Sequence, residues 1–226
     1  MGGRRRRRRR SEHEGNALLR TIAVLDYGMG NLRSVARAVE HVGGTVHVTE
    51  DGARALNADG LVVPGVGHFG ACIRNLRERG LDAVVKEFAT SGRPTFGVCV
   101  GMQVLFDGSE EAPGVPGMGL FEGVSKRLPA IVKVPHMGWN RVVWSEEHPY
   151  VRDVPETWFY FVHSFAPPSG PGIVGSTRYG APFAAAVAKD NVFATQFHPE
   201  KSGRWGLRLY EEFVRNVEAS SEQRAR

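Results

Sequence analysis

The order of apolar and polar positions predicts alternating strands and helices in the first half of the chain. Residues 21–27 (TIAVLDY) form a short β-rich run that ends at Gly28 and Gly30, and Asn31 then opens a helical pattern to about Val42. Further strands are predicted near residues 45–49, 60–63 and 94–99, and further helices over much of 69–91 and from Cys99 to about 106. These strands are continuous apolar runs, as expected where helices cover both faces of a parallel sheet.

From Gly123 onward the pattern changes to short β-segments separated by Pro and Gly. Strands are predicted near residues 124–126, 130–134, 141–144, 158–165, 183–188 and 192–197, followed by a helix over 203–217. No repeat or interdomain linker interrupts the sequence. We therefore predict one α/β domain over residues 21–217, a three-layer α/β/α sandwich with a central mixed, mostly parallel sheet. Residues 218–226 are expected to form a frayed C-terminal tail.

Composition narrows the class of protein further. A chain of 226 residues with 42% hydrophobic content can bury a large core. Its two cysteines, Cys72 and Cys99, are few for a disulfide-stabilised protein, and no secretory segment is apparent, so we expect a reducing, cytoplasmic location. No apolar run approaches the roughly 18 to 20 residues needed to span a bilayer.

The positive net charge of the chain resides in its N-terminal tail. Subtracting the seven arginines of Arg4–Arg10 from 29 basic residues leaves 22 against 24 acidic ones, so the rest carries about −2. The globular part is therefore not predicted to bind nucleic acid. Residues 1–20 are expected to be a disordered, idle extension, although an arginine run could also attract phosphate groups.

Cys99 lies in the pattern G-x-C-x-G, between Gly97 and Gly101, where a strand gives way to a helix. This is the cysteine counterpart of the nucleophile elbow, in which small flanking residues permit a tight turn that lifts the sulfur clear of the sheet. A helix N-terminus after Cys99 would stabilise its thiolate, and the amide of Val100 could donate to an oxyanion. Taken alone, the pentapeptide fits a buried structural cysteine equally well. Cys72, with no histidine or acid arranged around it, is expected to pack in the core.

Two further motifs complete the predicted chemistry. A thiolate nucleophile needs a general base and a group that orients the base, and His198-Pro199-Glu200 supplies both at a predicted strand end. Pro64–Gly67 (PGVG) follows another predicted strand, where glycines permit an inward-pointing amide. In isolation, HPE could be an ordinary surface turn and PGVG a plain turn before a helix.

Together, PGVG, GVCVGMQ and QFHPE resemble the class I, triad-type glutamine amidotransferases, in which Cys, His and Glu occur in this order. The resemblance implies hydrolysis of glutamine through a cysteinyl thioester, with ammonia passed to a synthase and with no cofactor or metal. Within the family, the chain is similar to the glutaminase subunits of imidazole glycerol phosphate synthase over about residues 21–217. The segments that carry this similarity are LDYGMGNLRSV, PGVGHFGAC, GMQVLFDGSEE, VPHMGWN and FVHSF.

Transferred position by position, the resemblance makes Cys99 the nucleophile, His198 the base and Glu200 its orienting carboxylate. It implies an oxyanion hole from the backbone amides of Val100, Val66 and Gly67, and glutamine contacts from Gln103, Glu111, Gly67, Ser164 and Phe165. Phe165 departs from the family pattern, which usually has tyrosine after HS. The loss of that hydroxyl is tolerable if only the backbone meets the substrate there.

The same resemblance implies a heterodimer with a (β/α)8 cyclase subunit. This partner would convert the nucleotide PRFAR and ammonia into imidazole glycerol phosphate and AICAR in histidine biosynthesis. The residues implied at its interface are Pro135, His136, Met137, Gly138, Trp139, Asn140 and Tyr160.

Three alternatives compete with this interpretation. A class I subunit for anthranilate, aminodeoxychorismate or pyridoxal phosphate synthesis would share the chemistry, but PHMGWN and LDYGMGNLRSV fit the histidine branch better. A cysteine peptidase or stress-response protein of related fold would not require Gln103 and Glu111. A non-catalytic scaffold would not require an intact Cys, His and Glu set.

Overall fold

The computed structural model describes residues 20–145 and 148–225. The Arg4–Arg10 run lies outside the described residues. No helix in the described part of the chain is long and apolar enough to cross a membrane.

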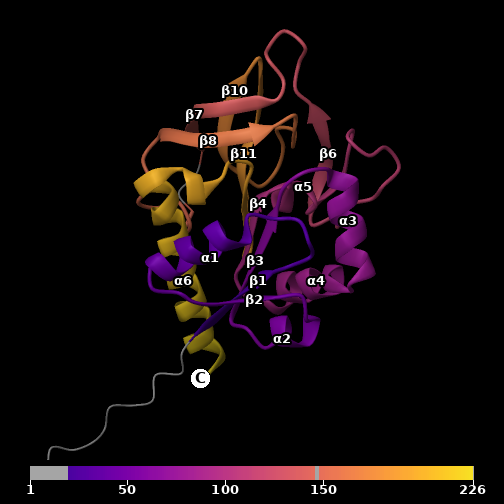
Figure 1. Cartoon of the computed structure of the whole chain (residues 1–226). Helices are drawn as coiled ribbons and strands as arrows, with labels where there is room; N and C mark the ends of the chain where they lie inside the picture. The colour runs from indigo at the N-terminus through magenta and orange to yellow at the C-terminus, as the bar shows by residue number, and fades with distance from the viewer. Residues whose placement is uncertain (1–19, 146–147, 226) are drawn as a thin grey trace, which may run out of the picture.

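A nine-stranded sheet forms the centre of the molecule (Figure 1). Its strand order is β2 (Thr45–Thr49), β1 (Thr21–Leu25), β3 (Gly60–Gly65), β4 (Thr95–Cys99), β12 (Val192–Thr195), β11 (Ala181–Lys189), β10 (Ile173–Tyr179), β7 (His136–Trp144) and β8 (Thr157–His163). The strands from β2 to β12 pair in parallel, and every pairing from β12 to β8 is antiparallel. The sheet is mixed, as predicted, but its antiparallel part is as extensive as its parallel part.

Helices cover the parallel part of the sheet on both faces. α1 (Leu32–His41) and α6 (Gly203–Arg224) pack together on one side, while α2 (Gly52–Leu56), α3 (Phe69–Glu78) and α4 (Leu81–Ser91) lie on the other (Figure 1). The fully buried strands β3 and β4 separate these two helical layers. The result is the three-layer α/β/α arrangement that the apolar runs predicted.

The remaining elements lie near the ends of β4 and β12. α5 (Val100–Gln103) follows β4 directly, and the 3₁₀ turn η1 (Pro199–Lys201) follows β12 after three residues. A small second sheet, β5 (Phe106–Ser109), β6 (Phe121–Arg127) and β9 (Phe165–Ala166), flanks them.

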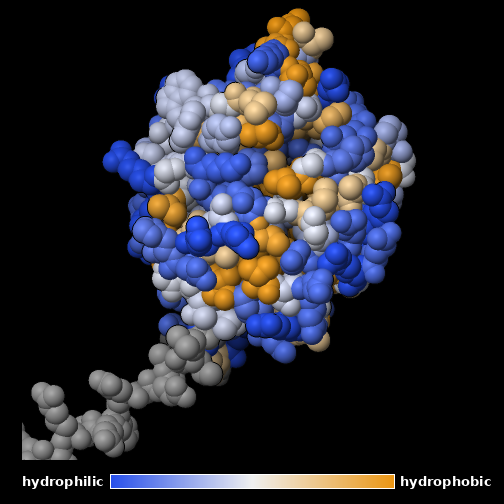
Figure 2. All heavy atoms as spheres, in the orientation of Figure 1, coloured by the Kyte–Doolittle hydropathy of each residue, from blue (hydrophilic) through white to orange (hydrophobic). Residues whose placement is uncertain are grey.

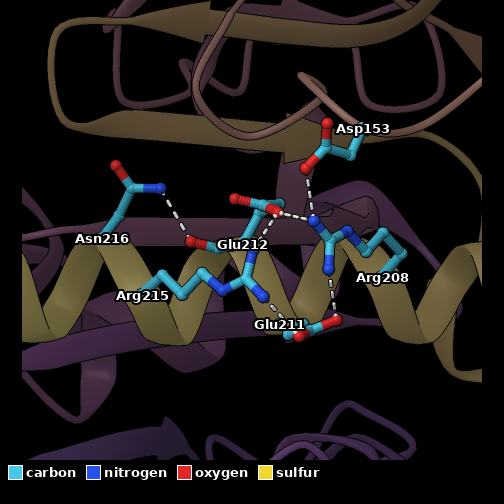
Figure 3. A network of polar contacts seen from close by, with 6 residues as sticks. All are labelled: Asp153, Arg208, Glu211, Glu212, Arg215 and Asn216. Atoms are coloured by element: carbon cyan, nitrogen blue, oxygen red, sulfur yellow. Dashed lines mark hydrogen bonds and ion pairs between the residues drawn. The ribbon is translucent and has the colours of Figure 1, made fainter.

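An ion-pair network attaches α6 to the segment before β8 (Figure 3). Arg208 bridges Asp153, in the loop, to Glu211 and Glu212 on its own helix. Arg215 contacts the same two glutamates at 2.7 and 2.9 Å, and the Asn216 side chain donates to the Glu212 carbonyl. Because the Glu212 side chain is only 9% exposed, these contacts are less screened by water than ordinary surface pairs. These contacts hold α6, the helix that follows the HPE segment, against the loop before β8.

Several predicted boundaries were wrong. Residues 130–134 are a turn rather than a strand: the Val132 amide bonds to the Pro129 carbonyl, and Ile131 is 83% exposed. The helix after Cys99 ends at Gln103. The C-terminal helix continues past Val217 to Arg224, because its last turn is anchored to Asp59 by Ser221 and Arg224.

Candidate active site

The backbone at Cys99 is strained, as the elbow motif predicts. Its φ of 57° lies in the left-handed region that residues with a Cβ rarely adopt. Glycine is required at both flanking positions because neighbouring backbone atoms lie too close to leave room for a Cβ. A Cβ at Gly101 would lie 1.9 Å from the Val63 carbonyl oxygen, and one at Gly97 would lie 2.9 Å from the Gly101 carbonyl oxygen. Only glycine at both positions lets β4 turn into α5 against β3.

The sheet topology brings the distant motifs together. β3, β4 and β12 are adjacent and parallel, with Cys99 opposite Gly65 and Val98 opposite Thr195. Their carboxyl ends therefore open onto the same edge of the sheet, where ligands bind in open α/β sheets. The segment after β12 is held there by a hydrogen bond from the His198 amide to the Tyr160 carbonyl oxygen, at 2.9 Å.

His198 and Glu200 form a buried pair. Nδ1 of His198 lies 2.9 Å from Oε1 of Glu200, and the two side chains are 4% and 1% exposed. Because the carboxylate accepts from Nδ1, Nε2 is the nitrogen left for Cys99. Burial lowers the pKa of His198, but the charge of a Cys99 thiolate, a hydrogen bond to it and the Glu200 carboxylate together raise this pKa to about 10. Beside a Cys99 thiolate, His198 is therefore held as an imidazolium.

The sulfur of Cys99 has two further polar neighbours. Nε2 of Gln196 lies 3.8 Å from Sγ, and the carbonyl oxygen of Val162 lies 3.9 Å from it. Sequence reasoning missed Gln196. A signal was available, because residues two apart on an extended segment point to the same side and Gln196 lies two before His198.

A cavity of about 170 Å³ opens above Cys99 and His198. Every residue expected at the oxyanion hole and around the glutamine lines it: Val66, Gly67, Val100, Gln103, Glu111, Ser164 and Phe165. Val162, His163 and Lys201 line it as well and were not predicted. Glu200 stands behind His198, outside the lining.

Two hydrogen bonds fix the cavity wall formed by the PGVG segment and α3. Oε2 of Glu111 accepts from the Phe69 amide at 2.7 Å, at the first turn of α3. Sγ of Cys72 lies 3.6 Å from the Val66 carbonyl oxygen. Burial raises the pKa of Cys72 to about 12, so this group remains a thiol and donates. Since Cys72 does not line the cavity, the Val66 carbonyl is directed at α3, and the Gly67 N–H of the same trans peptide points the opposite way.

The Gln103 side chain has both amide hydrogens engaged. Its Nε2 donates to the Phe165 carbonyl oxygen and to Oε1 of Gln196, each at 2.9 Å. A carboxamide carries two N–H groups, so only Oε1 of Gln103 remains for a ligand. Any ligand group that meets Gln103 must therefore be a donor.

The residues expected at the partner interface divide into two groups. Met137 and Trp139 are 63% and 51% exposed, and Trp139 packs edge-on against Tyr160. Pro135 is exposed, and Gly138 and Asn140 are half-buried. His136 is only 3% exposed, stacked on Phe161 and Tyr179, so its side chain cannot meet a partner directly. It points inward because successive residues of β7 face opposite sides of the sheet.

The described residues contain no group of three or more His, Cys, Asp or Glu side chains placed to hold a metal ion. The residues that the cavity does bring together are a cysteine nucleophile, a base with its orienting carboxylate, and backbone amides.

Comparisons with known proteins agree with this site. Residues 23–217 match the family Glutamine amidotransferase class-I. The chain is 48% identical over 199 residues to the imidazole glycerol phosphate synthase subunit HisH of Acinetobacter baylyi, covering 85% of this chain and 97% of that one. It is 46% identical over 198 residues to the subunit of the same name from Moorella thermoacetica, covering 86% and 94%.

Among solved structures, a glutamine amidotransferase superposes with a TM-score of 0.70 at 21% identity, over 87% of this chain and 98% of that chain. PurLQS from Thermotoga maritima contains a chain that superposes with a TM-score of 0.66 at 16% identity, covering 89% and 99%. These similarities extend over the elements that carry Cys99, His198 and Glu200, and the chain belongs to the class I glutamine amidotransferases.

Proposed function

We propose that this chain is the glutaminase subunit of a cytoplasmic imidazole glycerol phosphate synthase. It hydrolyses glutamine to glutamate and ammonia, and the ammonia passes to a (β/α)8 cyclase subunit that acts on PRFAR. The observation that carries the proposal is the buried arrangement of Cys99 and His198 in the cavity lining, with Glu200 behind His198. The relatives named as HisH supply the synthase to which that chemistry belongs.

The first half of the reaction forms a thioester. The Cys99 thiolate attacks the side-chain carbonyl carbon of glutamine, a C–S bond forms, and the carbonyl electron pair moves onto oxygen. Backbone N–H groups of Val100 and of Val66 or Gly67 stabilise this oxyanion. When the intermediate collapses, the C–N bond breaks and His198 gives its proton to the leaving nitrogen, which departs as ammonia.

The second half restores the site. Water attacks the thioester carbon while neutral His198 takes one of its protons. The C–S bond then breaks, Cys99 leaves as a thiolate beside imidazolium His198, and the new carboxyl group releases its proton to solvent. Glu200 keeps the imidazole in one tautomer through both halves.

Glutamine itself is held by the groups around the cavity. Oε1 of Gln103 accepts from the substrate, since both hydrogens on its Nε2 are engaged within the protein. The Glu111 carboxylate is suited to the α-ammonium group of glutamine, because its charge is opposite and it lies in the lining. Ser164 and Phe165 complete the wall through the strand that follows His163.

The cyclase docks on the exposed side of β7 and β8. Met137 and Trp139 on β7 pair with Val162 and Tyr160 on β8, and Trp158 beside them is 56% exposed. Exposed aromatic side chains of this kind anchor protein interfaces. Val162 also lines the cavity, so a partner on this surface covers the cavity mouth.

A second apolar feature lies near the same end of the molecule. In Figure 2 apolar residues gather at the projecting tip that Figure 1 places between β6 and β7. Ile131 lies in this segment. We assign the tip to the same docking surface.

The PGVG segment, which would supply an oxyanion donor, offers a means for the cyclase to control glutaminase activity. Gly65 and Gly67 flank Val66 and permit its peptide to rotate, and one lost oxyanion donor costs roughly a hundredfold to a thousandfold in rate. We infer that the isolated chain also adopts the rotated peptide, in which the Val66 carbonyl leaves Cys72 and faces the cavity, and that this state makes it a weak glutaminase. A cyclase loaded with its nucleotide binds preferentially to the conformation in which this peptide donates to the oxyanion. Binding therefore shifts the population toward that conformation.

The test is co-purification with the organism's cyclase barrel, followed by assays of glutamate release and glutamine-dependent cyclisation. Rates are compared for the chain alone, with the barrel, and with the barrel plus its nucleotide ligand. Equal rates in all three conditions would contradict partner control. Absence of glutamine-dependent cyclisation in a stable complex would contradict the assignment to this synthase.

The docking surface has its own test. Trp139→Ala should weaken binding of the barrel by at least tenfold, as expected for a central aromatic anchor. Val48→Ala is the matched control, because Val48 is 40% exposed on the opposite edge strand β2. An equal affinity for the two variants would place the interface elsewhere.

A further inference from the structure

We propose that Gln196 belongs to the catalytic machinery: its side-chain amide donates a hydrogen bond to Sγ of Cys99 and stabilises the nucleophilic thiolate. This inference rests on the proposed role of Cys99 as the nucleophile. The contact joins Nε2 of Gln196 to Sγ across 3.8 Å, a distance within hydrogen-bonding range for sulfur.

The orientation of the Gln196 amide follows from its neighbours. The Phe165 carbonyl oxygen can only accept, so the Gln103 atom 2.9 Å from it must be the nitrogen. That same nitrogen lies 2.9 Å from the Gln196 side chain, which must therefore present its oxygen. The Gln196 nitrogen is left facing Cys99. Rotating either amide by half a turn would oppose two donors or two acceptors.

Burial strengthens this hydrogen bond. Gln196 is 0% exposed, Gln103 is 2% exposed and Cys99 is 3% exposed, so water does not compete for the sulfur at this side. The other polar neighbour of Sγ is the Val162 carbonyl oxygen, which favours a thiol over a thiolate because it can only accept. The N–H of Gln196 opposes that preference, in addition to imidazolium His198.

The same contact also fixes the sulfur in space. The Gln196 backbone amide donates to the Ala185 carbonyl oxygen at 2.8 Å, which anchors the residue to β11, and Gln103 holds its side chain. Sγ therefore has a fixed donor on one side and His198 on another. No proton moves between Gln196 and Cys99 at any step.

The experiment measures the rate of Cys99 alkylation by iodoacetamide against pH in the full chain, with the modified site identified by mass spectrometry. The other cysteine does not interfere, because Cys72 is fully buried and burial raises its thiol pKa to about 12. Gln196→Met removes the donor and keeps the length of the side chain. Thr195→Val is the control, since Thr195 is equally buried and its hydroxyl donates to the Phe197 carbonyl oxygen rather than to Cys99.

We expect Gln196→Met to raise the midpoint of the alkylation profile by about one pH unit, the effect of one hydrogen bond to a charged group. Gln196→Glu, which places an oxygen against the sulfur, should raise it further. Thr195→Val should leave the midpoint unchanged. In the complex with the barrel, Gln196→Met should lower kcat more than it changes KM.

A Gln196→Met midpoint equal to that of the unaltered chain would overturn the proposal and leave Gln196 a packing residue. Should this variant fail to fold, the side-chain amide protons of Gln196 can be followed by NMR in the unaltered chain. They should shift as pH passes through the alkylation midpoint, and not shift in Cys99→Ala; an unchanged signal in both would equally overturn the proposal. Failure of the nucleophile assignment is distinguishable, because it would appear as glutaminase activity in a Cys99→Ala complex.

Discussion

Nδ1 of His136 and Nε2 of His163 lie 3.1 Å apart in a buried pair that connects the docking strand β7 to the cavity wall. Nδ1 of His163 is 2.9 Å from the Phe165 carbonyl oxygen, which can only accept, so that nitrogen carries a hydrogen. Nε2 of His163 therefore accepts, and His136 donates. Both rings are neutral in this arrangement.

The pair makes the protein acid-sensitive. Burial lowers the pKa of His136 to about 4 and that of His163 to about 3, against 6.5 for an ordinary histidine. Below pH 6.5 the unfolded chain therefore binds protons at these two histidines, whereas the folded chain binds them only at lower pH. The free energy of unfolding is therefore highest above pH 6.5 as far as these two groups are concerned. It falls as the pH is lowered toward 4 and then 3, by up to about 1.4 kcal/mol per pH unit for each ring. Urea unfolding at pH 7 and at pH 5 measures it; equal stability at both would contradict the buried neutral pair.

Replacing the nucleophile should separate two activities. Cys99→Ala is expected to abolish glutamine-dependent cyclisation in the complex and to leave ammonia-dependent cyclisation intact, because the cyclase needs only free ammonia. Both are measured as product formation with either nitrogen source. Loss of both in a correctly assembled complex would show that Cys99 has a different role.

The elbow should tolerate no side chain at Gly101. Gly101→Ala places a Cβ 1.9 Å from the Val63 carbonyl oxygen, within the backbone of a central strand that cannot move aside. We expect a loss of about 3 kcal/mol or more in the free energy of unfolding. Gly170→Ala is the control, since a Cβ there meets nothing within 4 Å and the residue has no positive φ. A chemical denaturation curve for Gly101→Ala that overlays the control would contradict the geometry.

The network on α6 should contribute to stability. Glu212→Gln keeps the shape of the side chain but removes the charge that Arg208 and Arg215 share. We expect a loss of about 1 to 2 kcal/mol, which for a chain of this size lowers Tm by roughly 2 to 8 °C. Glu218→Gln, on the same helix, is the control variant with which the Tm of Glu212→Gln is compared. An unchanged Tm for Glu212→Gln would mean that the network does not add to stability.

Sequence reasoning succeeded where one local pattern decides the structure. The apolar runs of β1, β3 and β4 identified the parallel core, and the flanking glycines identified the turn at Cys99. The comparisons confirmed the family. Local patterns failed for residues 130–134, where the letters Ala, Ile and Val suggest a strand although no neighbouring strand pairs with them.

Contacts between distant segments were beyond the reach of the sequence. The end of α6 depends on Asp59, and the position of Gln196 against Cys99 depends on Gln103 and the Phe165 carbonyl. The inward side chain of His136 depends on the register of β7 with β8. Alternation along a strand can indicate which residues share a side, as it does for Gln196 and His198, but it does not identify the distant residues that they contact.

The positive φ at Cys99 places stability and activity in opposition at one position. A left-handed conformation costs a residue with a Cβ roughly 1 to 2 kcal/mol, and glycine is exempt. Cys99→Gly should therefore unfold at a higher temperature than the active chain while hydrolysing no glutamine. A laboratory selection for thermostability alone would favour glycine at this position and so discard the enzyme. Improved variants of this chain must instead be screened on glutamine turnover.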